Sequence, residues 1–131
     1  ADIARLLDAD LHLGQTDLPP AEARRILGPD RIIGFSTHNA DQLRAAAGEP
    51  VDYLAIGPIF STSSKAKPDP VVGLDNLRAW RSLTSRPLVA IGGITRATAP
   101  SVLATGADSV AIIGDLIEWL KNPAQGPLPF R

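Results

Sequence analysis

The sequence predicts an α/β fold in which about five parallel strands alternate with helices. Short runs rich in aliphatic and β-branched residues alternate with longer segments whose apolar residues recur every three or four positions. The short runs are apolar at consecutive positions, as in "PLVAIGGI", which is typical of strands covered on both faces. With 131 residues, of which 44% are hydrophobic, the chain is long enough for one domain with its own core.

Five runs have the character of strands in a parallel sheet. "RIIGF" and "SVAII" are nearly continuous in apolar residues. The segments between the runs are long enough for the helical crossovers that parallel strands require. In chain order, the expected strands span residues 11–13, 31–36, 53–59, 87–91 and 109–113.

The expected helices carry start and stop signals of their own. Asn39 and Thr95 are expected N-caps, because their side chains can accept hydrogen bonds from the unpaired N–H groups of a first turn. Pro20 and Pro100 fit first turns, where a missing N–H group costs no helical hydrogen bond. The expected helices span residues 1–8, 20–27, 39–47, 74–83, 96–105 and 115–121, and the expected C-terminal stops are Gly28, Gly48 and Gly106.

Composition narrows the function classes. The chain has no cysteine, which excludes disulfides and thiolate chemistry, and only two histidines, which argues against a His-rich metal site. Its net charge of −1 gives no sign of a nucleic-acid or anionic-membrane surface. Because no transmembrane or signal-peptide pattern is present, a cytoplasmic protein is the default expectation. We expect one domain over residues 1–121 and a Pro- and Gly-rich tail over residues 122–131.

Polar and glycine residues follow the predicted strands at their carboxyl ends, where parallel α/β folds form their sites. The third strand runs into "STSSK", whose Lys65, beside Thr62 and Ser64, either neutralises a phosphate or pyrophosphate or is a solvated loop lysine. The glycine pair at 92–93 either lets backbone N–H groups approach and bind a phosphate, or forms a tight turn without a ligand. "IG" at 113–114, at the next strand end, favours the phosphate.

Two further side chains, Asp17 and His38, keep two interpretations each. Asp17 either holds Mg²⁺ through oxygen or caps the helix that starts near Pro20. His12, between two leucines, is interpreted first as a hydrogen-bonded core histidine. His38 is either an acid/base or a solvated helix-start residue. Ser36 has no nearby His–Asp pair in a nucleophile-elbow setting, so a serine-hydrolase mechanism is not expected.

In their order along the chain, these motifs resemble the thiamine-phosphate synthase family, also called thiamine-phosphate pyrophosphorylase. The matching motifs are "HLGQTDLP" at 12–19, "IIGFSTHN" at 32–39, "VDYLAIGPIFSTSSK" at 51–65, "PLVAIGGIT" at 87–95 and "GADSVAII" at 106–113. The resemblance covers about residues 1–120, and "GQ-x-D" with a "T-x-S-K" version of the family's T-x-T-K loop makes it specific. The family fold is the TIM (β/α)₈ barrel, so the resemblance implies an incomplete, truncated barrel that matches the last five β/α units.

The resemblance also implies an activity in thiamine biosynthesis. Family members are transferases that join hydroxymethylpyrimidine pyrophosphate to hydroxyethylthiazole phosphate, giving thiamine phosphate and pyrophosphate. It implies Asp17 as a ligand of a Mg²⁺ cofactor, and Ser36 and Lys65 as catalytic residues that contact the pyrimidine pyrophosphate. The family usually has serine where this chain has Gly114, which keeps only the backbone N–H group. The residues implied for the thiazole phosphate are Thr62, Ser63, Ser64, Gly93, Ile113 and Gly114.

Two alternatives to the synthase stay open. A related thiazole tautomerase shares the barrel and uses a histidine near "STH" as acid/base, for which His38 is available. "GQTD" and Lys65 favour the synthase, because a tautomerase has no pyrophosphate to hold. The second alternative is a non-catalytic, phosphate-binding fragment of a barrel. Because a five-strand sheet has two open edges, we expect a homo-oligomer, either a dimer or a domain-swapped assembly, and no nucleic-acid or membrane partner.

Overall fold

The computed structural model describes residues 1–61 and 69–121. In these residues, five parallel strands form one sheet in the order β1-β2-β3-β4-β5, so each strand pairs with the next one along the chain. The strands are β1 (Leu11–Leu13), β2 (Ile33–Thr37), β3 (Tyr53–Ile56), β4 (Leu88–Ile91) and β5 (Ser109–Ala111). The predicted parallel α/β class is confirmed, and the sequential strand order is the one found in the wall of a (β/α)₈ barrel.

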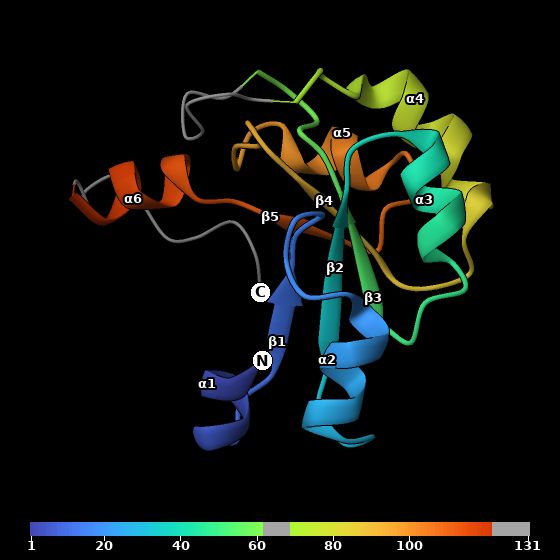
Figure 1. Cartoon of the computed structure of the whole chain (residues 1–131). Coiled ribbons are helices and arrows are strands. Elements are labelled where there is room, and N and C mark those ends of the chain that lie inside the picture. Colours follow the sequence, from blue (N-terminus) through green and yellow to red (C-terminus); the bar gives the residue numbers. More distant parts are fainter. Residues whose placement is uncertain (62–68, 122–131) are drawn as a thin grey trace.

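A helix follows or precedes every strand, and α2, α3 and α4 lie along the same side of the sheet (Figure 1). The helices are α1 (Asp2–Leu6), α2 (Pro20–Leu27), α3 (Ala40–Ala46), α4 (Gly73–Trp80), α5 (Ala99–Leu103) and α6 (Gly114–Lys121), and a 3₁₀ turn, η1 (Arg81–Leu83), extends α4. Within the described ranges, no helix has the length and apolar character needed to cross a membrane.

The core lies between one face of the sheet and these helices. Ile33, Leu54 and Leu88 point from neighbouring strands toward Leu43 and Leu77 of the helices, and all five are fully buried. Strand residues alternate between two faces, so the residues between them point to the opposite, inner face. On β4 the inner-face residues are only half-buried, whereas Ala55 on the inner face of β3 is 3% exposed. The expectation of strands covered on both faces therefore holds fully for one face and only in part for the other. The inner face is where polar groups gather.

Local hydrogen bonds confirm one predicted helix start and shift another. Asn39 is the N-cap of α3 as expected, its side chain accepting the N–H group of Gln42 at 2.9 Å. The prediction of a helix over residues 96–105 with Thr95 as its N-cap is wrong, because α5 begins only at Ala99. Thr95 and Thr98 close a separate turn, in which the Thr95 N–H group donates to the Thr98 hydroxyl at 2.9 Å. The predicted tail over residues 122–131 lies outside the described residues.

Two arginine–aspartate pairs hold the amino end of the sheet. Arg24 of α2 donates to Asp52 Oδ2 at 2.7 Å, and the same oxygen accepts the N–H group of Ile33, the first residue of β2, at 2.7 Å. Arg81 pairs with Asp108 at 3.1 Å, and that carboxylate accepts the N–H group of the first residue of β4 at 2.8 Å. Each pair therefore fixes the start of a strand to a helical segment.

Candidate functional site

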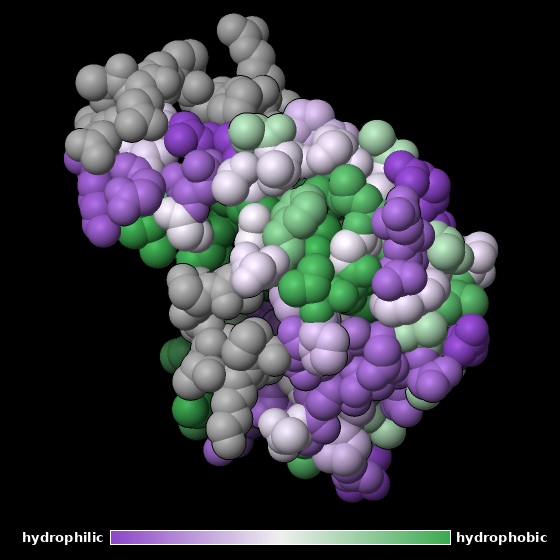
Figure 2. Space-filling model, turned by 90° about the horizontal axis from the view of Figure 1, so that it is seen from above, coloured by the Kyte–Doolittle hydropathy of each residue, from purple (hydrophilic) through white to green (hydrophobic). Residues whose placement is uncertain are grey.

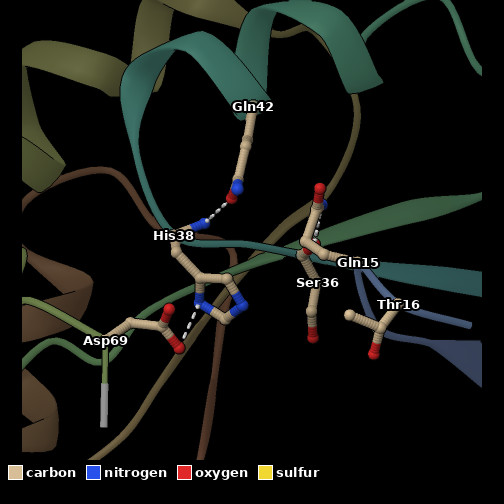
Figure 3. Close-up of a pocket in the computed structure, with 7 residues that line it drawn as sticks. Gln15, Thr16, Ser36, His38, Gln42 and Asp69 are labelled. Atoms are coloured by element: carbon tan, nitrogen blue, oxygen red, sulfur yellow. Dashed lines mark hydrogen bonds and ion pairs between the residues drawn. The ribbon is translucent and has the colours of Figure 1, made fainter.

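A polar pocket of about 300 Å³ opens at the carboxyl ends of β1 and β2. Its walls come from the loop after β1, the end of β2, the first turns of α3 and the segment before α4. The lining residues are Gly14, Gln15, Thr16, Ser36, His38, Gln42 and Asp69 (Figure 3). Seen from the side toward which β1 and β2 point in Figure 1, the surface has a hydrophobic central area bordered by hydrophilic residues (Figure 2).

Ser36 lies where two of the sequence motifs meet. Gln15, from the "GQTD" loop, donates through its side-chain amide to the Ser36 carbonyl oxygen at 2.7 Å. The Ser36 hydroxyl lies 2.8 Å from His12 Nε2 on the neighbouring strand. Ser36 thus has the histidine contact that sequence reasoning did not foresee, although the other ring nitrogen of His12 meets a phenol rather than a carboxylate. Ser36 is also on a strand rather than at a strand-to-helix elbow.

His12 lies on the inner face of the sheet, where its second ring nitrogen contacts Tyr53. His12 Nδ1 is 2.8 Å from the Tyr53 hydroxyl, and the two ring centroids are 5.5 Å apart. The expectation of a hydrogen-bonded core histidine is therefore half right. The hydrogen bonds are present, but the side chain is exposed, because its neighbour Leu13 occupies the core face and is only 3% exposed.

Gly34 makes this contact between His12 and Tyr53 possible. The sheet register places His12 beside Gly34, and Gly34 beside Tyr53, in one row across three strands. A Cβ atom on Gly34 would lie 2.1 Å from Tyr53 Cζ and 2.5 Å from His12 Nδ1. The missing side chain therefore provides the space in which the two rings meet across the middle strand.

Burial shifts the pKa values of both rings toward their neutral forms. Partial burial lowers the pKa of His12, and the nearby Asp17 carboxylate opposes that shift. Partial burial also raises the pKa of the Tyr53 hydroxyl, with a further contribution from the negative charge of Asp10. Near neutral pH, the contact is therefore between a neutral imidazole and a neutral phenol.

His38 is held by fixed partners rather than solvated at the helix start. Its Nδ1 atom lies 2.7 Å from the Gly57 carbonyl oxygen and 3.6 Å from Asp69 Oδ2. Its backbone N–H group donates to the Gln42 side chain at 2.8 Å. Because a carbonyl oxygen can only accept, the proton of the neutral ring must be on Nδ1, which leaves Nε2 as an acceptor. Figure 3 shows His38 between Gln42 and Asp69 at one side of the pocket.

Asp17 closes a turn in the loop after β1. Its Oδ2 atom accepts the N–H group of Gly14 at 2.6 Å, while its own N–H group donates to the Gly14 carbonyl oxygen at 3.2 Å. It does not cap α2, which starts at Pro20 without a side-chain cap. No group of three His, Asp or Glu side chains suited to a metal ion occurs in residues 1–61 and 69–121. These residues therefore offer a Mg²⁺ ion the Asp17 carboxylate but no preformed cage.

Gly93 lies against the start of the hydroxyl-rich loop. The Phe60 N–H group donates to the Gly92 carbonyl oxygen at 3.0 Å, and a Cβ atom on Gly93 would lie 2.6 Å from the Ser61 carbonyl oxygen. The φ angles of 97° and 66° at these two glycines show why the tight turn needs them. The predicted phosphate contacts of Thr62, Ser63, Ser64 and Lys65 lie outside the described residues.

The last predicted contacts, Ile113 and Gly114, lie at the end of β5, and both are exposed. Gly114 is the first residue of α6 rather than part of a strand. Arg96, which follows the glycine turn, donates from its backbone and from Nε to Asp115 Oδ2 at 3.0 and 2.7 Å. This contact ties the turn after β4 to the start of α6. In the described part of the chain, no hydrogen bond joins Gly93 directly to Ile113 or Gly114.

Sequence reasoning missed Tyr53, Gln42 and Asp69. Tyr53 gave no sequence signal of its own, because only the strand register aligns it with Gly34 and His12 across three strands. Gln42 and Asp69 gave no signal, since each lies in a polar segment away from any motif end.

A parallel sheet in sequential order, with a polar pocket at the carboxyl ends of its strands, defines a protein of the (β/α)-barrel class. The family model described as thiamine monophosphate synthase matches residues 1–116. The chain therefore belongs to the thiamine monophosphate synthase family.

Individual relatives agree with this assignment. The chain is 63% identical over 107 residues to the thiamine-phosphate synthase of Koribacter versatilis, a match that covers 82% of this chain and 51% of that protein. It is 45% identical over 117 residues to the Moorella thermoacetica thiamine-phosphate synthase, covering 88% of this chain and 56% of that one. The solved thiamine phosphate pyrophosphorylase from Pyrococcus furiosus superposes with a TM-score of 0.74 at 38% identity, covering 86% of this chain and 53% of that chain. The chain thus spans about half the length of the curated relatives it matches.

Proposed function

We propose that this chain acts in thiamine-phosphate synthesis, joining hydroxymethylpyrimidine pyrophosphate to hydroxyethylthiazole phosphate with release of pyrophosphate. Family membership supports the reaction class. The observation that carries the proposal to this site is the hydrogen bond from Gln15 to the Ser36 carbonyl oxygen, which joins two family motifs at one pocket.

The proposed chemistry is electrostatic stabilisation of a leaving group. The bond from the pyrimidine methylene carbon to the pyrophosphate oxygen breaks, the electron-rich aminopyrimidine supports the resulting cation, and the thiazole nitrogen then forms the new C–N bond. Ser36 and Lys65 would contact the departing pyrophosphate, whose charge must be balanced for the bond to break. A Mg²⁺ ion bound through Asp17 would supply further positive charge there.

The thiazole phosphate is proposed to bind near the glycine turn that contains Gly93. Gly93 supports this, because it lies against the carbonyl group of Ser61, next to the segment that contains the predicted hydroxyl donors. The proposed contacts are Thr62, Ser63, Ser64, Gly93, Ile113 and Gly114. The proposed substrates are small and phosphorylated, so neither nucleic acid nor membrane has a role, and the proposed location is the cytoplasm.

A second candidate function is favoured by the geometry of His38. With its Nδ1–H group donating to Gly57 and near Asp69, its Nε2 atom is available to move a proton, as the thiazole tautomerase alternative requires. An isomerisation assay on the thiazole phosphate, without the pyrimidine substrate, separates the two. Turnover in that assay that disappears in a His38→Gln variant would favour the tautomerase.

The synthase proposal is tested by incubating the chain with both substrates and Mg²⁺ and measuring thiamine phosphate. Product that is lost in Ser36→Ala and kept in Ser82→Ala, an exposed serine far along the chain, is the expected result. Binding of the pyrimidine pyrophosphate without product would favour the non-catalytic, phosphate-binding alternative. The absence of both binding and product would refute the proposed function.

The proposed homo-oligomer has its own observation and test. In the described residues, β1 and β5 each pair on one side only, which leaves two open strand edges. Size-exclusion chromatography with light scattering should give a mass of at least two chains, and a well-folded monomer would contradict the proposal.

A further inference from the structure

We infer that Tyr53, His12 and Ser36 form a directed hydrogen-bond chain, in which Tyr53 and His12 are positioning residues that turn the Ser36 hydroxyl proton toward an anionic oxygen in the pocket. The inference rests on the proposed function in one respect, because it takes that oxygen to belong to a pyrophosphate group. It goes further by assigning roles to two residues outside the predicted site.

The three groups are joined by two short contacts on one face of the sheet. Both ring nitrogens of His12 are engaged at 2.8 Å, Nδ1 with the Tyr53 hydroxyl and Nε2 with the Ser36 hydroxyl. The contacts link β1, β2 and β3, and Ser36, two residues beyond Gly34, lies on the same face as Gly34, nearer the carboxyl end of the sheet. The hydrogen-bond chain therefore begins at Tyr53 on β3 and ends at Ser36 in the wall of the pocket.

Only two directions are open to this chain when the imidazole is neutral, because a neutral ring has one donor and one acceptor nitrogen. In the first direction, the Tyr53 hydroxyl donates to Nδ1, and the Nε2–H group donates to the Ser36 oxygen. In the second direction, Ser36 donates to Nε2, and the Nδ1–H group donates to Tyr53. The first leaves the Ser36 proton available to a ligand, whereas the second uses it inside the protein.

Two features favour the first direction. A phenol is a more acidic donor than an aliphatic hydroxyl, so the tyrosine proton makes the stronger hydrogen bond to imidazole. In the described residues, moreover, His12 is the one hydrogen-bond partner of the half-buried Tyr53 hydroxyl. The second direction would leave that hydroxyl proton without an acceptor among the described residues, which is unfavourable for a partly buried group. In the first direction the Ser36 hydroxyl proton has no acceptor within the hydrogen-bond chain, but Ser36 lines the pocket, where a ligand can accept that proton.

The direction can be read from the tautomer of His12. The chain has only two histidines, so ¹⁵N NMR of the ring nitrogens gives two simple sets of signals. We expect His12 to be protonated at Nε2 and His38 at Nδ1, the latter because its partner is a carbonyl group. In Tyr53→Phe, the His12 signal should move toward a mixture of tautomers while that of His38 stays unchanged. Protonation of His12 at Nδ1 in the unmodified chain would overturn the inference.

The consequence for the ligand is measured with inorganic pyrophosphate and Mg²⁺ by calorimetry. Tyr53→Phe should weaken binding about three- to tenfold, the size expected from one well-placed hydrogen bond. Adding Tyr53→Phe to Ser36→Ala should cost nothing more, because the tyrosine acts only through the serine. Ser82→Ala is the matched control. Full additivity of the two variants, or unchanged binding in Tyr53→Phe, would contradict the positioning role.

The two measurements separate this inference from the proposed function. Failure of the unmodified protein to bind pyrophosphate would count against the proposed function. The tautomer of His12 would then decide the direction of the hydrogen bonds on its own. Far-ultraviolet circular dichroism on each variant shows whether lost binding reflects lost folding. If Tyr53→Phe unfolds the chain, Ser36→Ala gives a second test, since His12 should stay protonated at Nε2 when only the acceptor at that end is removed.

Discussion

The two ends of the sheet are held by different kinds of interaction. At the amino end, charged pairs fix the strand starts, and each aspartate accepts from both an arginine and a backbone N–H group. At the pocket, by contrast, the hydrogen bonds from Tyr53 through His12 to Ser36 join neutral groups. The charged Arg96–Asp115 pair at the carboxyl end is not among the residues that line this pocket. The amino-end charges are thus matched within the protein, whereas the pocket keeps side chains that can still donate or accept.

This difference explains how the fold separates stability from binding. The Asp52 carboxylate is engaged by Arg24 and Ile33, and its pKa is lowered by these partners in spite of partial burial. At the other end, His38 Nε2 and the Ser36 hydroxyl face the pocket. Changes at the amino end should therefore alter the free energy of unfolding, and changes at the carboxyl end should alter ligand binding.

The largest effect is expected from Gly34→Ala, which changes both properties at once. The added methyl group would overlap the rings of Tyr53 and His12, so we expect a loss of about 1–3 kcal/mol in the free energy of unfolding. Urea denaturation measures this loss. Gly48→Ala is the control, because no described residue other than its chain neighbours lies within 4 Å of a Cβ atom there.

A second variant shows whether the overlap is the cause. Tyr53→Ala removes the ring that the new methyl group would meet first, so it should recover part of the loss when combined with Gly34→Ala. Equal losses in Gly34→Ala and Gly48→Ala would mean that the row of three residues has no special packing.

Asp52→Ala should have the next largest effect, confined to stability. It leaves the N–H group of the fully buried Ile33 and the Arg24 guanidinium without this acceptor, so a loss of about 1–2 kcal/mol is expected. Asp41→Ala, which removes an exposed helical ion pair with Arg44, should cost less than about 0.5 kcal/mol. Weaker pyrophosphate binding in Asp52→Ala, with its fold intact, would argue against the separation of the two ends.

The sequence could predict those features that depend on local pattern. Alternating apolar runs and crossovers indicated the parallel sheet, and the polar residues after the strands indicated the end at which the pocket lies. The His12–Tyr53 contact could not be predicted, because it depends on a register across a middle strand and on the space that Gly34 leaves for the two rings. Likewise, Asp17 bonds backwards to Gly14 instead of forwards to a helix, a choice made by the loop as a whole.

The two ends should also respond to acid at different pH values. The folded pKa of His12 lies below its ordinary value of 6.5, so its neutral form is favoured on folding. The corresponding stability is fully present above pH 6.5 and is lost as the pH falls through the lowered folded value. Asp52, whose folded pKa is also lowered, contributes stability above 3.8 that is lost only in stronger acid.

The free energy of unfolding, measured from pH 8 to pH 3 in the parent chain and in His12→Gln, tests whether the contribution of His12 is lost at a higher pH than that of Asp52. The variant should lose less stability between neutral pH and pH 5, by less than about 1 kcal/mol because the ring is only partly buried. Both proteins should then lose stability in parallel below pH 4. Identical profiles between neutral pH and pH 5 would show that His12 does not titrate as a partly buried group.

The smallest effect is expected where the carboxyl end is most open, at Gly114. Among the described residues, and apart from its chain neighbours and the backbone of α6, no atom lies within 4 Å of a Cβ atom on this exposed residue. Gly114→Ser should therefore fit without displacing these surroundings. The new hydroxyl would add a donor beside the proposed thiazole phosphate and tighten binding of hydroxyethylthiazole phosphate by about two- to threefold, because the residue is exposed. Gly48→Ser, equally open but away from the strand ends, is the matched control for calorimetry. An unchanged affinity in Gly114→Ser would place the phosphate elsewhere, because a hydroxyl on the first residue of α6 can only act on a ligand at the end of β5.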